Sequence, residues 1–212
     1  MRTKADAVKI VNALKDAYPV DICSLDYNNA WQLMVAVRLS AQCTDARVNV
    51  VTEILFQKYP TLDALASASP EDIEAIVRPC GLGRSKARDI SAASKIVLHE
   101  YGGLLPDTME QLLCLPGVGR KSANLILGDI YRTPGVVIAD THCIRIAGRL
   151  GFVSSKDPLK VENALRKALP PTESNDFCHR CVLHGRAVCT ARKALCSECV
   201  LGVLCPKVGV AT

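Results

Sequence analysis

Hydrophobic residues recur at intervals of three and four positions along most of the chain, which is the spacing of one face of an α-helix. Near the N-terminus the series is Ala7, Ile10, Val11, Leu14 and Tyr18. Thr3 and Asp6 form a start signal before this stripe, and Pro19 follows it as a stop. The pattern therefore predicts an amphipathic helix between these signals.

The same periodicity predicts helices over most of the remaining sequence. Residues 33–39 and 48–56 have the apolar character of buried helices, and residues 90–97 carry a stripe that ends at two glycines. Asp157 and Pro158 have the order of an N-cap and a first helical residue. The apolar run 136–138 is the one candidate strand, and three residues make no sheet. We therefore predict an all-α fold.

Length and composition are those of an ordinary globular protein, large enough for one big domain or two small ones. The start of the sequence lacks the apolar core of a secretory signal. No apolar run approaches the roughly 18 residues of a membrane span. We therefore expect a soluble protein that does not enter membranes and works in an intracellular, reducing compartment.

Cysteine is unusually frequent, with 11 residues. In a reducing compartment clustered cysteines point to a metal or to catalysis, since disulfides are rare there. Five are scattered, and we expect these to be small buried hydrophobes: Cys23, Cys43, Cys80, Cys114 and Cys143. The other six lie between residues 178 and 205. Four of them form a C-x6-C-x2-C-x5-C run typical of a cluster site: Cys189, Cys196, Cys199 and Cys205.

Positive charge is concentrated in the same region. The formal net charge is +5, and residues 178–212 carry five cations against Glu198 alone. Such a local field attracts polyanions and makes their binding salt-dependent, although a merely solvated surface has the same composition.

The segment 115–119, Leu-Pro-Gly-Val-Gly, separates two predicted helices at 109–114 and 120–131. Its glycines permit a tight turn, and the amides at the start of the second helix form an anion site. This is a helix-hairpin-helix signature, which holds DNA phosphates without reading sequence. We expect the phosphates to contact Gly117, Val118, Gly119 and Arg120. The motif alone does not indicate catalysis.

Two side chains add possible chemistry. Lys121 lies one residue into the second helix, where the helix dipole and Arg120 both disfavour its protonated form, as a Schiff-base nucleophile requires. An exposed phosphate-contacting lysine is the alternative. Asp140 follows a short apolar run and should cap a helix over 141–150. A carboxylate held in that way is also able to stabilise developing positive charge.

The chain resembles the endonuclease III family over nearly its whole length. The resemblance is carried, in the expected order, by Leu39-Ser40-Ala41-Gln42, Gly81-Leu82, Ser85-Lys86-Ala87, residues 115–124, Ala139-Asp140-Thr141-His142, His184-Gly185-Arg186 and the four-cysteine run. It implies a bifunctional DNA glycosylase and abasic-site lyase that removes oxidised pyrimidines from double-stranded DNA. By position, Lys121 attacks the deoxyribose C1′ and Asp140 assists departure of the base. The Schiff base then permits β-elimination and a break on the 3′ side.

The resemblance also implies roles for two further side chains. Gln42 and Leu82 should fill the space left by the extruded base and wedge the opposite strand. A helix-capping amide and a loop hydrophobe are their alternative interpretations. The implied fold has two helical domains flanking a DNA-binding cleft: a six-helix barrel with the hairpin over 25–136, and a cluster domain from 1–24 and 137–212. We expect a monomer that acts in the cytoplasm on the nucleoid.

In this family the four cysteines hold a [4Fe–4S] cluster, and the loop between the first two contacts DNA, which makes Arg192 and Lys193 phosphate-binding candidates. Zinc is the alternative metal. Cys178-x2-Cys181 and the pair at 196 and 199 approach a zinc-ribbon spacing, although that arrangement leaves the other two cysteines unused.

The sequence departs from the family pattern at two places. Arg38 stands where an aliphatic residue is usual, and Cys178, Arg180 and Cys181 replace a histidine, an aromatic and an aliphatic residue. An adenine-mismatch glycosylase is a weaker alternative, since that group lacks a lysine at position 121 and adds a C-terminal domain, whereas this sequence continues only seven residues beyond Cys205. A non-catalytic DNA-binding or redox-sensing cluster protein would require Lys121 and Asp140 to be coincidental.

Overall fold

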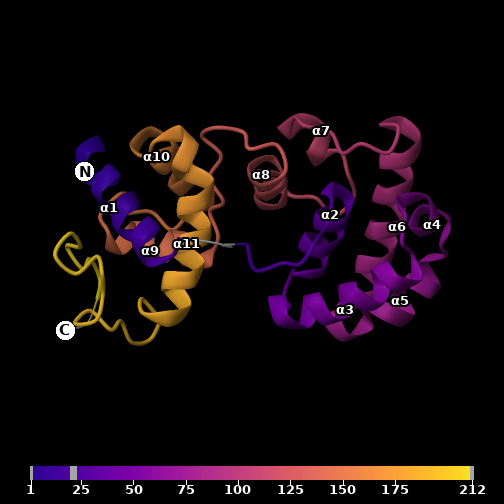
Figure 1. The fold of residues 1–212 in the computed structure, drawn as a ribbon, viewed down its shortest axis with the longest axis horizontal. Coiled ribbons are helices and arrows are strands. Elements are labelled where there is room, and N and C mark those ends of the chain that lie inside the picture. The colour runs from indigo at the N-terminus through magenta and orange to yellow at the C-terminus, as the bar shows by residue number, and fades with distance from the viewer. Residues whose placement is uncertain (1, 20–22, 211–212) are drawn as a thin grey trace. The chain divides into compact units, whose positions relative to one another are not determined.

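The computed structural model describes residues 2–19 and 23–210, so the predicted domain limits at residues 1 and 212 lie outside it. The described chain is helical and contains no β-sheet, which confirms the all-α prediction (Figure 1). Its α-helices are α1 (Lys4–Ala17), α2 (Ala30–Leu39), α3 (Asp45–Lys58), α4 (Leu62–Ser67), α5 (Pro70–Val77), α6 (Gly83–Glu100), α7 (Met109–Leu113), α8 (Arg120–Asp129), α9 (Thr141–Arg149), α10 (Pro158–Ala168) and α11 (Ser174–Ala187). Two 3₁₀ turns are η1 (Arg78–Cys80) and η2 (Pro171–Glu173).

Local capping chemistry sets several helix ends. Helix α1 begins with a capping box, in which Thr3 Oγ1 accepts from the Asp6 amide at 3.1 Å and the Asp6 carboxylate accepts from the Thr3 amide at 3.2 Å. Helix α6 ends before two positive-φ glycines, and the Gly103 amide donates to the Val97 carbonyl at 2.9 Å. The predicted start of α1 and end of α6 are therefore confirmed.

The chain divides into two compact units. The central unit, Cys23–Tyr131, contains α2 to α8. Here α6 packs against α2, α4 and α5, while α2 also packs against α3 and α8 (Figure 1). Its buried side chains are aliphatic and include Leu33, Leu39, Leu55, Leu65, Ile73 and Ile90. Helices α7 and α8 pack against each other and form the hairpin.

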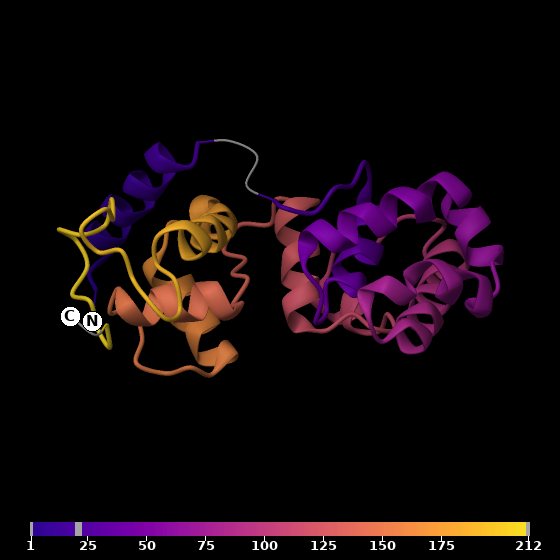
Figure 2. The same ribbon diagram turned by 90° about the horizontal axis from the view of Figure 1, so that it is seen from below.

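The split unit combines Met1–Ile22 with Arg132–Thr212. Helix α11 packs against α1 and α9, so the N-terminal helix completes a core made mostly by the last third of the chain. In both views the C-terminal segment, in yellow, lies beside α1, in indigo (Figure 1, Figure 2). Arg2 joins them by donating hydrogen bonds to the carbonyls of Leu150 and Leu204.

Several expectations need correction. The helices predicted to reach residues 131 and 150 end at Asp129 and Arg149, because the chain turns one or two residues earlier. Of the scattered cysteines, Cys80 and Cys143 are buried and Cys23 and Cys43 are half-buried, but Cys114 is exposed at the end of α7. None of the helices in the described residues has the length and apolarity needed to cross a membrane.

Candidate active site and cysteine pocket

The hairpin turn is anchored by apolar side chains and presents its backbone outward. Leu115 and Val118 are buried, and the Val118 amide donates to the Leu115 carbonyl at 3.1 Å. Gly117 has a φ of +78° and is exposed, as is Gly119. No side chain caps the first amides of α8, whose N-cap is Gly119. This helix start therefore presents N–H groups and the positive end of the helix dipole to an anion.

Lys121 is the second residue of α8 and is exposed. Its position follows from the turn, since α8 begins directly after Gly119. The hairpin thus places the uncapped amides at the start of α8 and a primary amine within the same helical turn of the central unit. An amine held beside a bound backbone phosphate is within one nucleotide of a sugar carbon, which is what nucleophilic attack on that carbon requires.

Asp140 belongs to the split unit and is half-buried. The buried run Val136, Val137 and Ile138 fixes the chain in front of it. Its Oδ1 accepts from the Cys143 amide at 2.6 Å, which confirms the predicted N-cap of α9. Because this bond occupies one carboxylate oxygen, the orientation of the whole carboxylate is set by the helix.

Gln42 and Leu82 both lie in exposed turns of the central unit with left-handed backbone conformations, at φ values of 57° and 52°. Leu82 is 55% exposed although it is a large hydrophobe. Gln42 caps no helix; the N-cap of α3 is Thr44, whose hydroxyl accepts from the Arg47 amide. The capping interpretation of Gln42 is therefore wrong.

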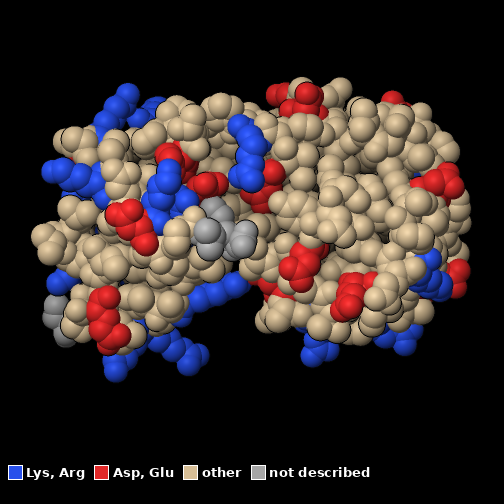
Figure 3. Space-filling model, in the orientation of Figure 1, with Lys and Arg blue, Asp and Glu red and all other residues tan. Residues whose placement is uncertain are grey.

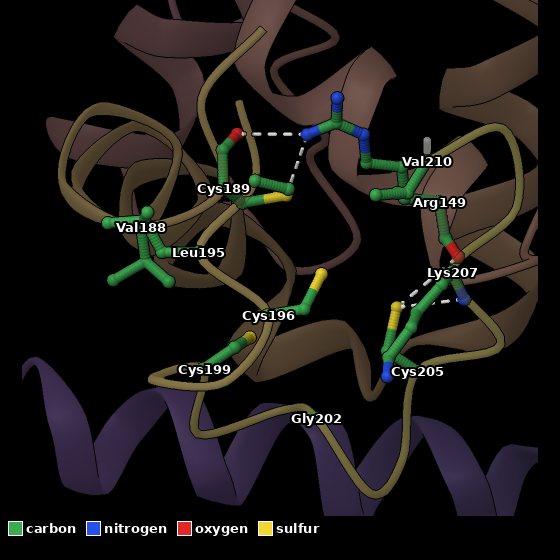
Figure 4. Close-up of a pocket in the computed structure, with 11 residues that line it drawn as sticks. Arg149, Val188, Cys189, Leu195, Cys196, Cys199, Gly202, Cys205, Lys207 and Val210 are labelled. Carbon is green, nitrogen blue, oxygen red and sulfur yellow. Dashed lines mark hydrogen bonds between the residues drawn. The ribbon is translucent and has the colours of Figure 1, made fainter. Parts of the chain in front are cut away.

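The four tail cysteines line one pocket in the split unit. Figure 4 shows Cys189, Cys196, Cys199 and Cys205 around a common space. Burial, together with the neighbouring cysteines, raises the pKa of the Cys199 and Cys205 thiols. A bound cation is what holds such grouped thiols as thiolates.

The spacing of these sulfurs tests which metal fits. Four thiolates on a tetrahedral zinc, with bonds of about 2.3 Å, lie only about 3.8 Å apart. Among the described residues, no three of the four sulfurs lie within 4.8 Å of one another. The donor set fits a group that binds each thiolate at a separate metal atom better than it fits one zinc ion.

Backbone and side-chain donors support the pocket. Arg149 Nη1 donates to Cys189 Sγ at 3.1 Å (Figure 4). It also donates to the Thr190 carbonyl at 2.8 Å. The Lys207 amide donates to Cys205 Sγ at 3.3 Å. Hydrogen bonds of this kind to ligand sulfurs orient them and tune the bound group.

A buried imidazole lies at another ligand. His184 Nε2 is 3.4 Å from Cys199 Sγ, and its Nδ1 is 3.1 Å from the Tyr18 hydroxyl. Burial lowers the pKa of His184, so the ring is neutral at physiological pH. The contact joins α1, α11 and the cysteine pocket through three side chains.

Arg192 and Lys193 lie in the loop between the first two cysteines and are exposed. The loop is closed by a bridge between Cys189 and Ala194, and the Lys193 amide donates to Thr190 Oγ1 at 3.2 Å. Elsewhere basic and acidic side chains alternate among uncharged residues on the face seen in Figure 3. The loop is therefore a small ordered platform with two adjacent cations.

Comparisons with known proteins agree with this geometry. The family model described as HhH-GPD superfamily base excision DNA repair protein matches residues 35–171. The endonuclease III of Synechocystis sp. is 45% identical over 203 residues, covering 96% of this chain and 93% of that protein. The chain belongs to the endonuclease III family. As a member, it is a base excision repair enzyme, a DNA glycosylase with abasic-site lyase activity.

Two solved endonuclease III structures share the fold. One is a non-covalent endonuclease III–DNA complex, and the other is a trapped endonuclease III–DNA covalent intermediate, an estranged-adenine complex. Each matches with a TM-score of 0.89 and 37% identity, and covers 98% of this chain and 97% of its own.

The first departure from the endonuclease III pattern, Arg38, lies beneath the hairpin. Its guanidinium contacts Asp89 at 2.6 Å and donates to Ser85 Oγ at 3.3 Å, both on α6. An aliphatic residue at this place would fill space, whereas Arg38 also ties α2 to α6. Arg38 therefore changes which side chain supports the hairpin turn.

The second departure builds a buried thiol cluster beside α9. Cys178 and Cys181 are buried in α11 and do not line the cysteine pocket. Cys178 Sγ accepts from the Ile138 amide at 3.2 Å and lies 3.8 Å from Cys143 Sγ. Burial raises the pKa of both α11 thiols, so they are neutral. The zinc-ribbon pairing with residues 196 and 199 is thus not found in the described part of the chain.

Two arginines of α9 were missed by the sequence analysis. Arg145 donates to the carbonyls of Gly185 and Cys189, both at 3.0 Å, and Arg149 holds the same loop one turn later. Gly185 has no room for a side chain, because an added Cβ would stand 2.5 Å from His142 Nδ1. The signal for this role was the spacing of four between the two arginines on the helix that begins at Asp140.

Proposed function

We propose that this enzyme removes oxidised pyrimidines from double-stranded DNA through a Schiff base on Lys121. The observation that carries the proposal is the exposed amine placed directly after an uncapped, glycine-bounded hairpin. A neutral Lys121 amine attacks C1′ as the bond to the damaged base breaks, and the base leaves with a proton. The C1′–O4′ bond then opens, with O4′ taking a proton from solvent, which leaves an iminium between Lys121 and C1′. The iminium acidifies the C2′ proton, and removal of that proton expels the 3′ phosphate by β-elimination.

Asp140 assists departure of the base in this proposal. As the glycosidic bond stretches, positive charge develops on the sugar, and an oriented carboxylate stabilises it. Its cap bond to α9 supports this role, because a carboxylate fixed before the reaction needs no reorganisation during it.

Gln42 and Leu82 fill the space that the extruded nucleotide leaves and press against the opposite strand. Their exposure and their rigid, left-handed turns support this function. The hairpin residues Gly117, Val118, Gly119 and Arg120, together with Arg192 and Lys193, contact phosphates on either side. Binding therefore depends on shape and charge, and recognition depends on which base leaves the stack.

The four cysteines of the pocket hold a [4Fe–4S] cluster. Its thiolate ligands each bind a separate iron, which agrees with the separation of the sulfurs. When bound, the cluster would fix the fold of the segment that carries the Arg192–Lys193 loop. Measurement of about four iron and four sulfide per chain supports it, while one zinc per chain and no iron contradicts it.

The two units divide this work. We assign the barrel domain to the central unit and the cluster domain to the split unit, with limits near the predicted residues 24 and 136. The protein acts as a monomer on damaged or abasic duplex DNA in the cytoplasm, where a reducing environment preserves the thiols.

Borohydride trapping tests the central proposal. The duplex contains thymine glycol opposite adenine, and wild type is compared with Lys121→Gln and with Lys95→Gln, an exposed lysine of α6. Borohydride reduces the iminium to a stable amine. We expect a covalent adduct with wild type and Lys95→Gln and none with Lys121→Gln. A wild type that binds the duplex without forming an adduct would show a monofunctional glycosylase or a binding protein.

A further inference from the structure

The most deeply buried charged side chain of the described residues is that of Lys86, with 0% exposure. Its Nζ donates three hydrogen bonds, to the carbonyls of Leu39 at 2.8 Å, Ala41 at 2.7 Å and Cys80 at 2.9 Å. An ammonium has three N–H donors, so all of them are used. A buried lysine is rare unless such partners compensate for the lost water.

The three acceptors belong to two separate turns. Ala41 directly precedes Gln42 at the end of α2, and Cys80 ends η1 two residues before Leu82. The backbone amide of Lys86 also donates to the Leu82 carbonyl at 3.0 Å. One residue of α6 therefore binds the backbone on which Gln42 stands and the backbone on which Leu82 stands.

Both of those turns are strained. A left-handed conformation costs a non-glycine residue about 1–2 kcal/mol, so it persists only where the surroundings determine it. No side chain caps the start of α6 at Leu82, and the side-chain cap of α3 is at Thr44, two residues after Gln42. The bonds from Nζ to these carbonyls constrain both turns from the interior of the unit, because the Lys86 side chain is fully buried.

Stability alone does not account for a cation in this place. Burial lowers the pKa of Lys86, while the nearby Cys80 and Cys43 act in the opposite direction and Arg38 adds to the lowering. A buried charge is a weak source of stability, since an apolar residue of similar volume would pack as well or better. What an apolar residue does not provide is a fixed distance between three carbonyl oxygens.

We propose that Lys86 is a positioning residue that fixes the Gln42 and Leu82 turns relative to each other, so that both side chains enter the DNA as one rigid wedge. This inference rests on the roles proposed for Gln42 and Leu82. Lys86 itself touches neither the substrate nor the reacting atoms. Its contribution is confined to steps that need the wedge, which are extrusion of the damaged base and support of the vacated space.

A comparison of two substrates separates positioning from general support of the fold. Duplex DNA with thymine glycol requires extrusion from the stack. A single-stranded abasic oligonucleotide requires only Schiff-base formation, because no opposite strand is present. We expect Lys86→Met to slow single-turnover base excision from the duplex by about tenfold or more. Borohydride trapping on the single strand should remain within about twofold of wild type. Equal losses on both substrates would overturn the proposal.

A double-mutant cycle gives an independent readout. In the Gln42→Ala/Leu82→Ala background the wedge is absent, so adding Lys86→Met should cause no further loss of duplex excision. If Lys86→Met slowed duplex excision as much in that background as it does in wild type, Lys86 would act independently of the wedge. Lys86→Gln keeps two N–H donors without the charge, and we expect it to fold and to show an intermediate duplex defect. An undiminished duplex rate in Lys86→Gln and Lys86→Met would also contradict the proposal.

Failure of the proposed function is distinguishable from failure of this inference. If the enzyme does not use a Schiff base, wild type itself gives no adduct on the single-stranded abasic oligonucleotide, whatever residue 86 is. If only the positioning role is wrong, wild type traps on both substrates, and the Lys86 variants either lose both activities in parallel or keep both.

Discussion

Arg38 occupies the space that a side chain on Gly117 would need. A Cβ added at Gly117 would stand 2.5 Å from Arg38 Cδ and 3.0 Å from Asp89 Cβ. Arg38 has little freedom to move away, because Asp89 holds its guanidinium. We therefore expect Gly117→Ala to lower the free energy of unfolding by about 2–4 kcal/mol, from left-handed strain and overpacking together. Binding to an undamaged duplex should weaken as well.

Urea unfolding with a matched glycine checks this prediction. Gly119 has no atom within 4 Å of an added Cβ and a φ of −97°, so Gly119→Ala should change stability by less than about 0.5 kcal/mol. In an Arg38→Ala background the penalty of Gly117→Ala should fall, since the two shortest contacts are gone and only the backbone strain and the contact with Asp89 Cβ remain. Equal penalties in both backgrounds would show that Arg38 yields freely.

Substitutions of Asp140 should separate its capping role from its chemistry. Asn caps a helix as well as Asp does, so Asp140→Asn should keep the thermal stability of wild type. Removal of the carboxylate should nevertheless slow base excision at least about 100-fold. Asp140→Ala should lose activity and also about 1 kcal/mol of stability. An active Asp140→Asn enzyme would limit the residue to capping.

Arg149 should control how firmly the cysteine pocket keeps its metal. Arg149→Met removes hydrogen bonds to the carbonyls of Cys189 and Thr190 and to Cys189 Sγ. We expect the free energy of unfolding to fall by about 1–3 kcal/mol as a result. Iron release to a chelator, followed by absorbance, should accelerate. Lys167→Met removes an exposed ammonium of α10 and serves as the control. Identical release from both variants would contradict this role.

The ion pair between Lys15 and Glu173 should make stability depend on pH. Their atoms are 2.7 Å apart, and the hydrogen bond from Lys15 lowers the pKa of Glu173 below its ordinary value of 4.5, with Arg180 contributing. Since the folded pKa is depressed, this stabilisation is complete above pH 4.5 and is lost as the pH falls through the folded value.

Glu173→Gln should therefore cost about 0.5–1 kcal/mol at pH 7 and much less at pH 3. Urea unfolding of both proteins at the two pH values measures this difference, with the exposed Glu53→Gln as a control. The same difference at both pH values would mean that packing, and not charge, is what the substitution removes.

Sequence patterns were sufficient where one side of a helix is apolar and its ends carry capping residues. Helix α1 is an example, with Ile10 and Leu14 buried and a capping box at Thr3. The hairpin turn and the N-cap at Asp140 could also be predicted from the sequence. Glycines are typical of a tight turn, and an aspartate directly before a helix is typical of an N-cap.

Helix α11 was not predicted, because its buried face is largely polar. Its buried residues include His179, Arg180 and His184 together with two cysteines, so no hydrophobic stripe marks it. Tertiary partners determine that burial: Arg180 Nε donates to the Tyr18 carbonyl at 3.1 Å, and His184 contacts Tyr18 and Cys199. Lys86 was likewise visible only as part of a motif, since its three acceptors lie 6 to 47 residues away in sequence.

The packing of α1 against α11 determines when each half of the enzyme matures during synthesis. Domains fold as units while the chain leaves the ribosome. The central unit has all of its helices once Tyr131 has emerged. In contrast, about 155 residues lie between the end of α1 at Ala17 and the start of α11 at Ser174, so α1 has no α11 to pack against until these have been made. The hairpin is therefore complete on a nascent chain whose four-cysteine pocket does not yet exist, so the cluster that we propose for this pocket would bind only after the central unit has been made.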